Sequence, residues 1–158
     1  MARLMALDVG EARIGVAISD SSGILASPYT TLRVSRDEAQ TWLAIQRLMR
    51  ETDTEGLVIG LPISLDGQIH GQGERVQAFA ERLKQHITIP VTFWDERLST
   101  VEAERLLAQQ DQDIQGKPFR RGTRRRSSTG QRRKHQEIDA MAAAVILQEY
   151  LDHSGMSS

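Results

Sequence analysis

Three acidic residues that lie far apart in the sequence, Asp8, Glu96 and Asp139, each stand beside a strongly apolar segment. Asp8 follows LMAL, Glu96 follows VTFWD, and Asp139 precedes AMAAAVIL. Carboxylates beside apolar surface are costly unless they are paired or bound to metal. Oxygen ligands of this kind suit Mg²⁺ or Mn²⁺, and two such ions about 3.5–4 Å apart recur in enzymes that cut phosphodiesters. The three acids therefore predict a divalent-metal site, if one fold brings them together.

The neighbours of these acids narrow the choice of ligands. Successive residues of a strand face opposite sides of a sheet, so Asp95 and Glu96 cannot both point into one site unless the strand bends there, and Glu96 is the predicted ligand. Arg97 either binds the substrate phosphate or neutralises a nearby carboxylate. Taken alone, Asp139 would be an acidic residue that the dipole of a helix N-terminus favours. Asp20 is a further candidate ligand, supported only by its place at the end of a predicted strand.

The turn after Asp8 contains Gly10, which would let the backbone approach a phosphate or a metal-bound water. Turns commonly combine aspartate and glycine, so this pattern alone is weak. It also fits the phosphate loop of actin-like ATPases and sugar kinases. Those proteins need a second lobe to close over the nucleotide, and a chain of 158 residues is too short to supply one.

A basic segment at 117–134 holds nine of the twenty lysine and arginine residues and no acidic residue. The formal net charge of the whole chain is only −1, so attraction to a polyanion would be local. Basic tracts are often only solvated segments. One that directly precedes an acid of a candidate metal site favours nucleic-acid contact instead. The residues expected at this contact are Arg124, Arg125, Arg126, Arg132, Arg133 and Lys134.

Composition places the chain among ordinary globular domains. Its hydrophobic fraction is 39% and its charged fraction 26%, and 158 residues suffice for one well-buried core. The chain has no cysteine, which excludes disulfides, zinc-thiolate sites and thiol catalysis. An acid follows the short apolar start, and no apolar run approaches membrane-spanning length. We expect a cytoplasmic protein that makes no contact with membranes.

Hydrophobic periodicity predicts strands and helices in alternation. Strands are expected at 3–9, 13–19, 24–34, 57–59 and 91–94, and helices at 36–52, around 76–83, from Ser99 to 110, and at 136–153. The first and third helices have capping-box spacing, Ser35 with Glu38 and Ser99 with Glu102. A long loop is expected at 111–134.

This order of elements predicts an α/β fold of the ribonuclease H-like type. Three antiparallel meander strands would begin a mixed sheet, later strands would add in parallel, and helices would flank it. Short turns at 9–12 and 20–23 favour the antiparallel pairing. No repeat or linker divides the sequence, so we expect a single domain over residues 1–158 with a basic loop at 111–134.

Four segments together resemble the YqgF/RuvX family of pre-16S ribosomal RNA nucleases, relatives of Holliday-junction resolvases in the ribonuclease H-like superfamily. They are LDVGEARIGVAISD at 7–20, VIGLPISLDG at 58–67 with VQAFAERL at 76–83, DERLST at 95–100, and IDAMAAAVILQEYL at 138–151. The resemblance spans almost the whole chain. It implies that Asp8, Glu96 and Asp139 occupy the metal-binding positions of the family, with Arg13 and Arg97 at its motif arginines. The segment at 117–134 departs from the family in being longer and richer in arginine.

The resemblance implies a Mg²⁺- or Mn²⁺-dependent hydrolase that matures the 5′ end of precursor 16S ribosomal RNA during ribosome biogenesis. Arg13, Arg97 and the basic segment would orient the substrate phosphates, with binding that weakens steeply with salt. One alternative keeps the chemistry but takes a four-way DNA junction, which would call for a homodimer. The other is a non-enzymatic nucleic-acid-binding factor for ribosome assembly.

Overall fold

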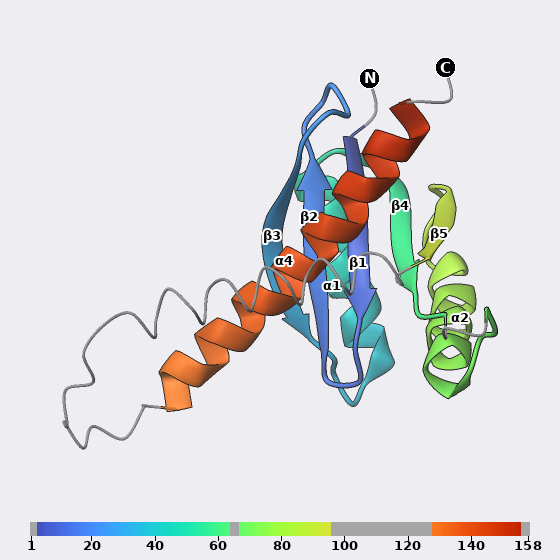
Figure 1. The fold of residues 1–158 in the computed structure, drawn as a ribbon. Coiled ribbons are helices and arrows are strands. Elements are labelled where there is room, and N and C mark those ends of the chain that lie inside the picture. Colours follow the sequence, from blue (N-terminus) through green and yellow to red (C-terminus); the bar gives the residue numbers. More distant parts are fainter. Residues whose placement is uncertain (1–2, 64–66, 96–127, 156–158) are drawn as a thin grey trace.

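A five-stranded mixed sheet forms the centre of the protein, in the order β3-β2-β1-β4-β5 (Figure 1). The computed structural model describes residues 3–63, 67–95 and 128–155, of which 128–136 and 154–155 are described by their backbone alone. The strands are β1 (Arg3–Val9), β2 (Arg13–Ser19), β3 (Ala26–Arg33), β4 (Thr54–Leu61) and β5 (Val91–Asp95). β1, β2 and β3 pair antiparallel, while β4 joins β1 and β5 joins β4 in parallel. The predicted meander with parallel additions is confirmed.

Helices cover both faces of this sheet (Figure 1). The helices are α1 (Glu38–Glu51), α2 (Gly71–Lys84) and α4 (Ser128–Gly155). α1 and α2 lie on one face, and α4 crosses the other diagonally. The helix predicted around 76–83 is confirmed as part of α2, and its inner face carries the buried residues Val76, Phe79, Ala80 and Leu83.

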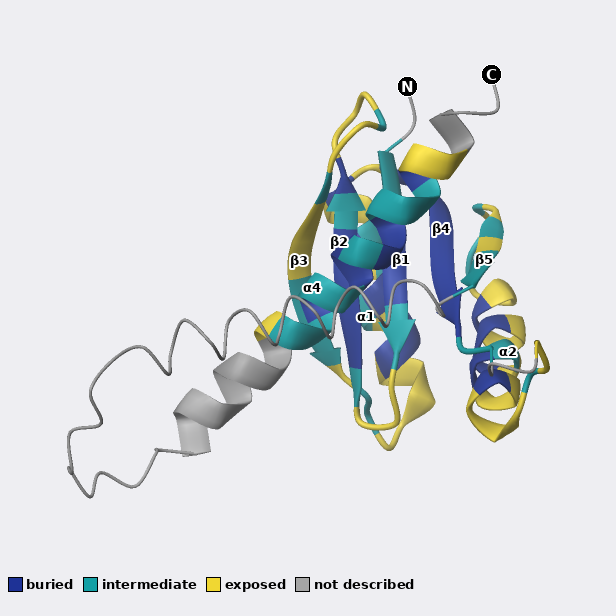
Figure 2. Ribbon diagram, in the orientation of Figure 1, coloured by how far each residue is buried: buried dark blue, intermediate teal, exposed yellow. Residues whose placement is uncertain are grey.

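Alternation along β1 divides the core into two layers. Met5 and Leu7 point toward α1 and α2 and are fully buried in the larger cluster, which also contains Trp42. Ala6 points the other way and packs against the smaller cluster formed by α4. The central strands are accordingly the most buried part of the sheet (Figure 2). Because Asp8 has the same parity as Ala6, it lies on the α4 face.

The start of α1 differs from the prediction of a Ser35 cap. Asp37 is the N-cap residue, and its carboxylate accepts a hydrogen bond from the backbone N–H of Ala39 at 3.1 Å. The hydroxyl of Ser35 instead accepts from the N–H of Asp37 at 3.3 Å. Ser35 therefore shapes the turn that precedes the helix, and the helix begins two residues later than a Ser35 cap would set it.

The last helix is longer than predicted. It begins at Ser128 rather than near Gln136, so 128–134, predicted as loop, are helical. Glutamine, arginine and lysine are good helix formers, which explains how the basic stretch continues the helix toward its N-terminus. The rest of the predicted basic loop, 111–127, and the helix predicted from Ser99 lie outside the described residues.

Side chains near the C-terminal end of α4 fix this helix to both sides of the sheet. Gln148 bridges to the β2–β3 connection, accepting from the N–H of Ala26 and donating to the carbonyl of Ile24, both at 2.9 Å. On the other side the indole N–H of Trp94 donates to Glu149 at 3.3 Å. These contacts hold α4 at a defined height over the sheet, which determines where Asp139 lies.

Candidate metal centre

Two of the three predicted metal ligands meet at Gly15, near the end of β1. Asp8 lies directly opposite Gly15 in the β1–β2 ladder, and opposed residues of an antiparallel pair point to the same face. Asp139, on α4, lies over Gly15 itself, since a Cβ atom added there would stand 1.9 Å from the backbone oxygen of Asp139. Residues separated by most of the chain thus flank one glycine on the α4 face.

Gly15 makes this close approach of helix and sheet feasible. An added Cβ would also stand 2.4 Å from the backbone carbon of Asp139 and 3.1 Å from the backbone nitrogen of Ala140. Small residues on the underside of α4 serve the same purpose, since Ala140 and Ala143 are both buried against the sheet. Small residues of α4 therefore face a glycine of the sheet where the helix crosses β2.

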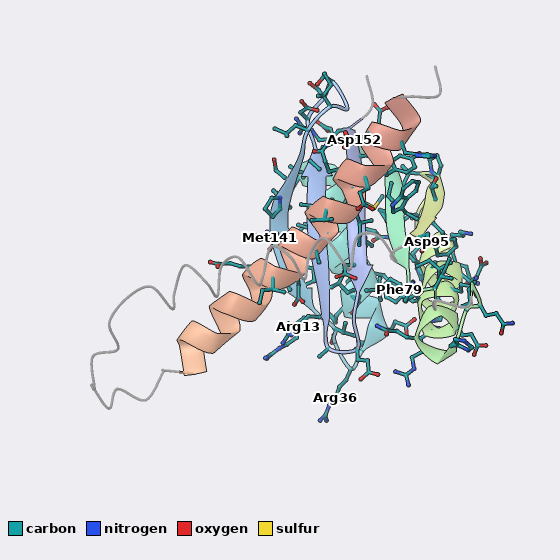
Figure 3. The ribbon with its side chains drawn as sticks, in the orientation of Figure 1. Arg13, Arg36, Phe79, Asp95, Met141 and Asp152 are labelled. Carbon is teal, nitrogen blue, oxygen red and sulfur yellow. The ribbon has the colours of Figure 1, made fainter. Side chains whose placement is uncertain are left out.

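Arg13 holds the carboxylate of Asp139. Its Nε donates to Oδ2 of Asp139 at 2.6 Å, with 40% of the Arg13 side chain and 23% of the Asp139 side chain exposed. Arg13 begins β2, two residues from Gly15, and points to the α4 face (Figure 3). A charge-assisted bond of this length orients the carboxylate, and its partial exposure leaves the pair open to a ligand from solvent.

Two other acids that were weighed as ligands lie elsewhere. Asp95 ends β5 opposite Leu61, and by alternation it shares the α1–α2 face with Phe93. Figure 3 shows Asp95 on the β5 side of the sheet, away from Arg13. Glu96 lies outside the described residues, so its choice over Asp95 stays a prediction.

Asp20 lies at the far end of β2 from Arg13 and shapes the β2–β3 turn. Its carboxylate accepts hydrogen bonds from the hydroxyl of Ser22 at 2.8 Å and from the N–H groups of Ile24 and Leu25. These bonds, led by that from Ser22, lower the pKa of Asp20 below its usual value. These hydrogen bonds give the Asp20 carboxylate a structural role in the turn, and its distance along β2 from Arg13 places it outside the candidate site.

The remaining predicted site residues are not placed together with this pair. Glu96, Arg97, Arg124, Arg125 and Arg126 lie outside the described residues. Arg132, Arg133 and Lys134 lie on α4, where only the backbone is described. Within 3–63, 67–95 and 128–155, no three histidine or acidic side chains gather as a metal site. The described part of the chain thus places two acidic residues, Asp8 and Asp139, beside the same glycine on one face of the sheet, and carboxylate oxygens are the ligands that hard divalent cations prefer.

The glycine that matters most at this site is Gly15, which sequence reasoning missed in favour of Gly10. Gly10 closes the β1–β2 turn, where its N–H donates to the carbonyl of Arg13 at 2.9 Å and a Cβ would stand 2.8 Å from that oxygen. The available signal was a glycine in the interior of a predicted strand, which often marks a close backbone approach. Only the packing of α4 shows what approaches it.

A family model described as "RuvX: Holliday junction resolvase" matches residues 2–153. The chain belongs to the RuvX family. Curated relatives named "Putative pre-16S rRNA nuclease" include one from Roseiflexus, 44% identical over 151 residues, covering 95% of this chain and 94% of that protein. Another, from Moorella thermoacetica, is 41% identical over 155 residues and covers 98% of each chain. The family predicted from the sequence is confirmed.

Solved structures of Thermus thermophilus RuvC share the fold of this RuvX family member. One, in complex with a Holliday-junction substrate, has a TM-score of 0.57 at 12% identity and covers 99% of this chain and 96% of that one. A second has a TM-score of 0.54 at 11% identity, covering 97% and 96%. At these identities the likeness concerns the fold alone, and it confirms the predicted ribonuclease H-like arrangement.

Among the described residues, no helix of this RuvX protein combines the length and apolar character that crossing a membrane requires.

Proposed function

We propose that this RuvX protein is a metal-dependent nuclease that hydrolyses phosphodiester bonds in precursor 16S ribosomal RNA during ribosome biogenesis. The observation that carries this proposal is the convergence of Asp8 and Asp139 on Gly15. Curated relatives at 41–44% identity carry the corresponding name, which favours ribosomal RNA as the substrate. The proposal treats residues 1–158 as a single nuclease domain in the cytoplasm.

In this proposal, Asp8, Asp139 and Glu96 hold Mg²⁺ or Mn²⁺. A bound divalent ion would supply Lewis-acid stabilisation of the phosphoryl group and a lowered pKa for the attacking water. Arg13 fixes the carboxylate of Asp139 in its ligating orientation through the bond to Oδ2. Because 40% of its side chain is exposed, Arg13 can also donate to a substrate phosphate. Arg97 and the basic residues at 124–126 and 132–134 would bind neighbouring phosphates.

Cleavage of a 5′-labelled precursor of 16S ribosomal RNA by purified protein, with Mn²⁺ present, tests this function. We expect wild-type protein to cut and Asp8→Asn, Glu96→Gln and Asp139→Asn to lose cleavage, and a chelator to abolish it. Glu55→Gln is the matched control, because Glu55 is an exposed acid near the opposite end of the sheet. Equal cleavage by wild-type and Asp8→Asn protein would contradict the proposal.

Metal binding provides a readout that does not depend on the choice of RNA. Titration of Mn²⁺ followed by electron paramagnetic resonance should show a bound population for wild type and for Glu55→Gln. Asp8→Asn should weaken it, because a hard cation loses an anionic oxygen ligand. Identical titrations of the wild-type and Asp8→Asn proteins would favour the non-enzymatic assembly-factor reading, in which the acids are structural.

A four-way DNA junction is the second candidate substrate, favoured by the description of the matching family model. A symmetric junction cutter needs two active sites related by a twofold axis and therefore a homodimer. Sedimentation of the protein with junction DNA, together with cleavage by the same acid variants, separates the two substrates. A stable monomer on the junction, with cutting of RNA alone, would exclude this candidate.

A further inference from the structure

Arg33 lies beside the candidate metal centre but outside the segments that carry the family resemblance, which end at residue 20 and resume at 58. It is the last residue of the edge strand β3 and lies directly opposite Arg13 in the β2–β3 ladder. Opposed residues of an antiparallel pair point to the same face, so Arg33 shares the α4 face with Arg13 and Asp139.

The two arginines differ in their partners. Like charges directly opposite each other in a sheet are destabilising, and Asp139 offsets this for Arg13 by forming an ion pair with it. Arg33 is exposed, and among the described residues its guanidinium has no ion-pair or hydrogen-bond partner. Among the described residues, Arg33 therefore presents a second guanidinium on the α4 face without an acidic partner, and its donors match a phosphate group.

The position of Arg33 indicates which phosphate it would bind. Neighbouring strands lie about 4.8 Å apart and residues about 3.3 Å apart along a strand, so the Cα atom of Arg33 lies roughly 12 Å from that of Asp8. Arg13 lies between them, because it is opposite Arg33 in the ladder and paired with Asp139, so Arg33 stands one strand farther from the acids than Arg13 does. Arg33 would thus bind a phosphate farther along the same nucleic-acid strand.

The backbone of α4 leads in the same direction, toward positions that the sequence fills with basic residues. Its N-terminal part extends past β3 (Figure 1). With a rise of 1.5 Å per residue, the backbone at 132–134 lies about 7–11 Å from Asp139 along the helix axis. These positions carry Arg132, Arg133 and Lys134. Positive residues therefore follow one another from β2 across β3 to the projecting part of the helix.

We propose that Arg33 binds a phosphate of the substrate strand that leaves the acidic pair across β2 and β3 toward the N-terminal part of α4. This inference rests on the proposed nuclease function, because it takes the acidic pair as the place where the substrate is cut. The nucleic-acid strand would leave the site over the β3 edge of the sheet and not over β4 and β5.

Binding of a fluorescein-labelled RNA duplex with a single-stranded overhang, measured by fluorescence anisotropy without divalent metal, tests this path. Arg33→Gln should weaken binding about tenfold, the loss expected for one charge-assisted contact. It should also reduce the slope of log affinity against log salt by about 0.7, the value for one phosphate of a single strand. Arg33→Lys should restore the slope, because it restores the charge.

Arg47→Gln is the matched control, since Arg47 lies on α1 on the opposite face, with 78% of its side chain exposed. It should bind as wild type does. Equal affinities and slopes for the Arg33→Gln and Arg47→Gln proteins would overturn the proposed path.

Cleavage is measured separately with Mn²⁺. A raised KM with unchanged kcat for Arg33→Gln would support the path, because Arg33 would then contribute binding alone. If wild-type protein cut no RNA while Arg33→Gln alone weakened binding, the nuclease proposal would fail and the binding role of Arg33 would stand. If wild type cut RNA and Arg33→Gln bound it as tightly as wild type, only the path would fail.

Discussion

Replacing Gly15 by alanine tests whether the packing of α4 on β2 determines the geometry of the acidic pair. The added Cβ would stand 1.9 Å from the backbone oxygen of Asp139, and ordinary contact begins at 3.4 Å. The helix backbone must therefore move away from β2 by about 1.5 Å, since the obstructing atoms are backbone and cannot rotate aside. Asp139 would move with it.

Two effects of different kind are expected from this displacement. Inserting a methyl group into a well-packed contact costs about 1–3 kcal/mol, which for a chain of this length lowers the Tm by about 2–12 °C. A misplacement of about 1 Å at a reacting centre can reduce the rate about a hundredfold. We therefore expect Gly15→Ala to remain folded at 25 °C but to lose most of its cleavage of precursor RNA.

Thermal unfolding followed by circular dichroism and cleavage with Mn²⁺ measure these effects on the same preparations. Gly56→Ala is the matched control, because its Cβ would meet only the Cδ2 atom of Leu4, at 2.7 Å, which can rotate away. Gly56→Ala should lose some stability and keep its activity per folded molecule. Wild-type activity in folded Gly15→Ala protein would refute the view that close packing positions Asp139.

Three further predictions follow from other contacts. Asp139→Asn should abolish cleavage. It should lower the free energy of unfolding by only about 1 kcal/mol or less, because the ion pair with Arg13 is partly exposed. A much larger loss of stability in chemical denaturation would mean that Asp139 has a structural role. The pKa of Asp20 is lowered in the folded protein, chiefly by the hydrogen bond from Ser22. Its contribution to stability is therefore fully present above pH 3.8, the ordinary pKa of an aspartate, and is lost as the pH falls through the lowered pKa of the folded state. An Asp20 carboxyl resonance that titrated at or above pH 3.8 in NMR would contradict this. Trp94→Phe removes the hydrogen bond to Glu149 and should lower the free energy of unfolding by about 0.5–1.5 kcal/mol in the same denaturation assay. Cleavage per folded molecule should be retained. An unchanged free energy of unfolding would show that this bond does not hold α4.

The sheet could be predicted from the sequence because its pattern is local. Alternating apolar residues mark β2, and capping and turn residues separate the strands, so the meander and its parallel additions follow from period and connection length. The ends of helices were harder to predict, because several residues that can cap a helix often lie close together in the sequence. Ser35 and Asp37 both precede α1, and the choice between them depends on which one can reach the first N–H groups of the helix.

The site was predictable in its residues but not in its contacts. Asp8 and Asp139 could be chosen as acids at the ends of apolar runs, whereas the role of Gly15 depends on how closely α4 packs on the sheet. The ion pair between Arg13 and Asp139 joins residues from opposite ends of the chain, and no local pattern pairs them. Arg33 escaped notice for the same reason, because only the strand register places it opposite Arg13.

β1 supplies Asp8 and α4 supplies Asp139, so Asp8 is synthesised well before Asp139. Until α4 emerges and packs over Gly15, one whole face of the sheet lacks its cover and the acidic pair does not exist. In a nascent chain that still lacks α4, the proposed site is therefore incomplete, however well the first strands have folded. The order of these elements in the sequence thus delays assembly of the proposed site until the segment that forms α4 has been translated.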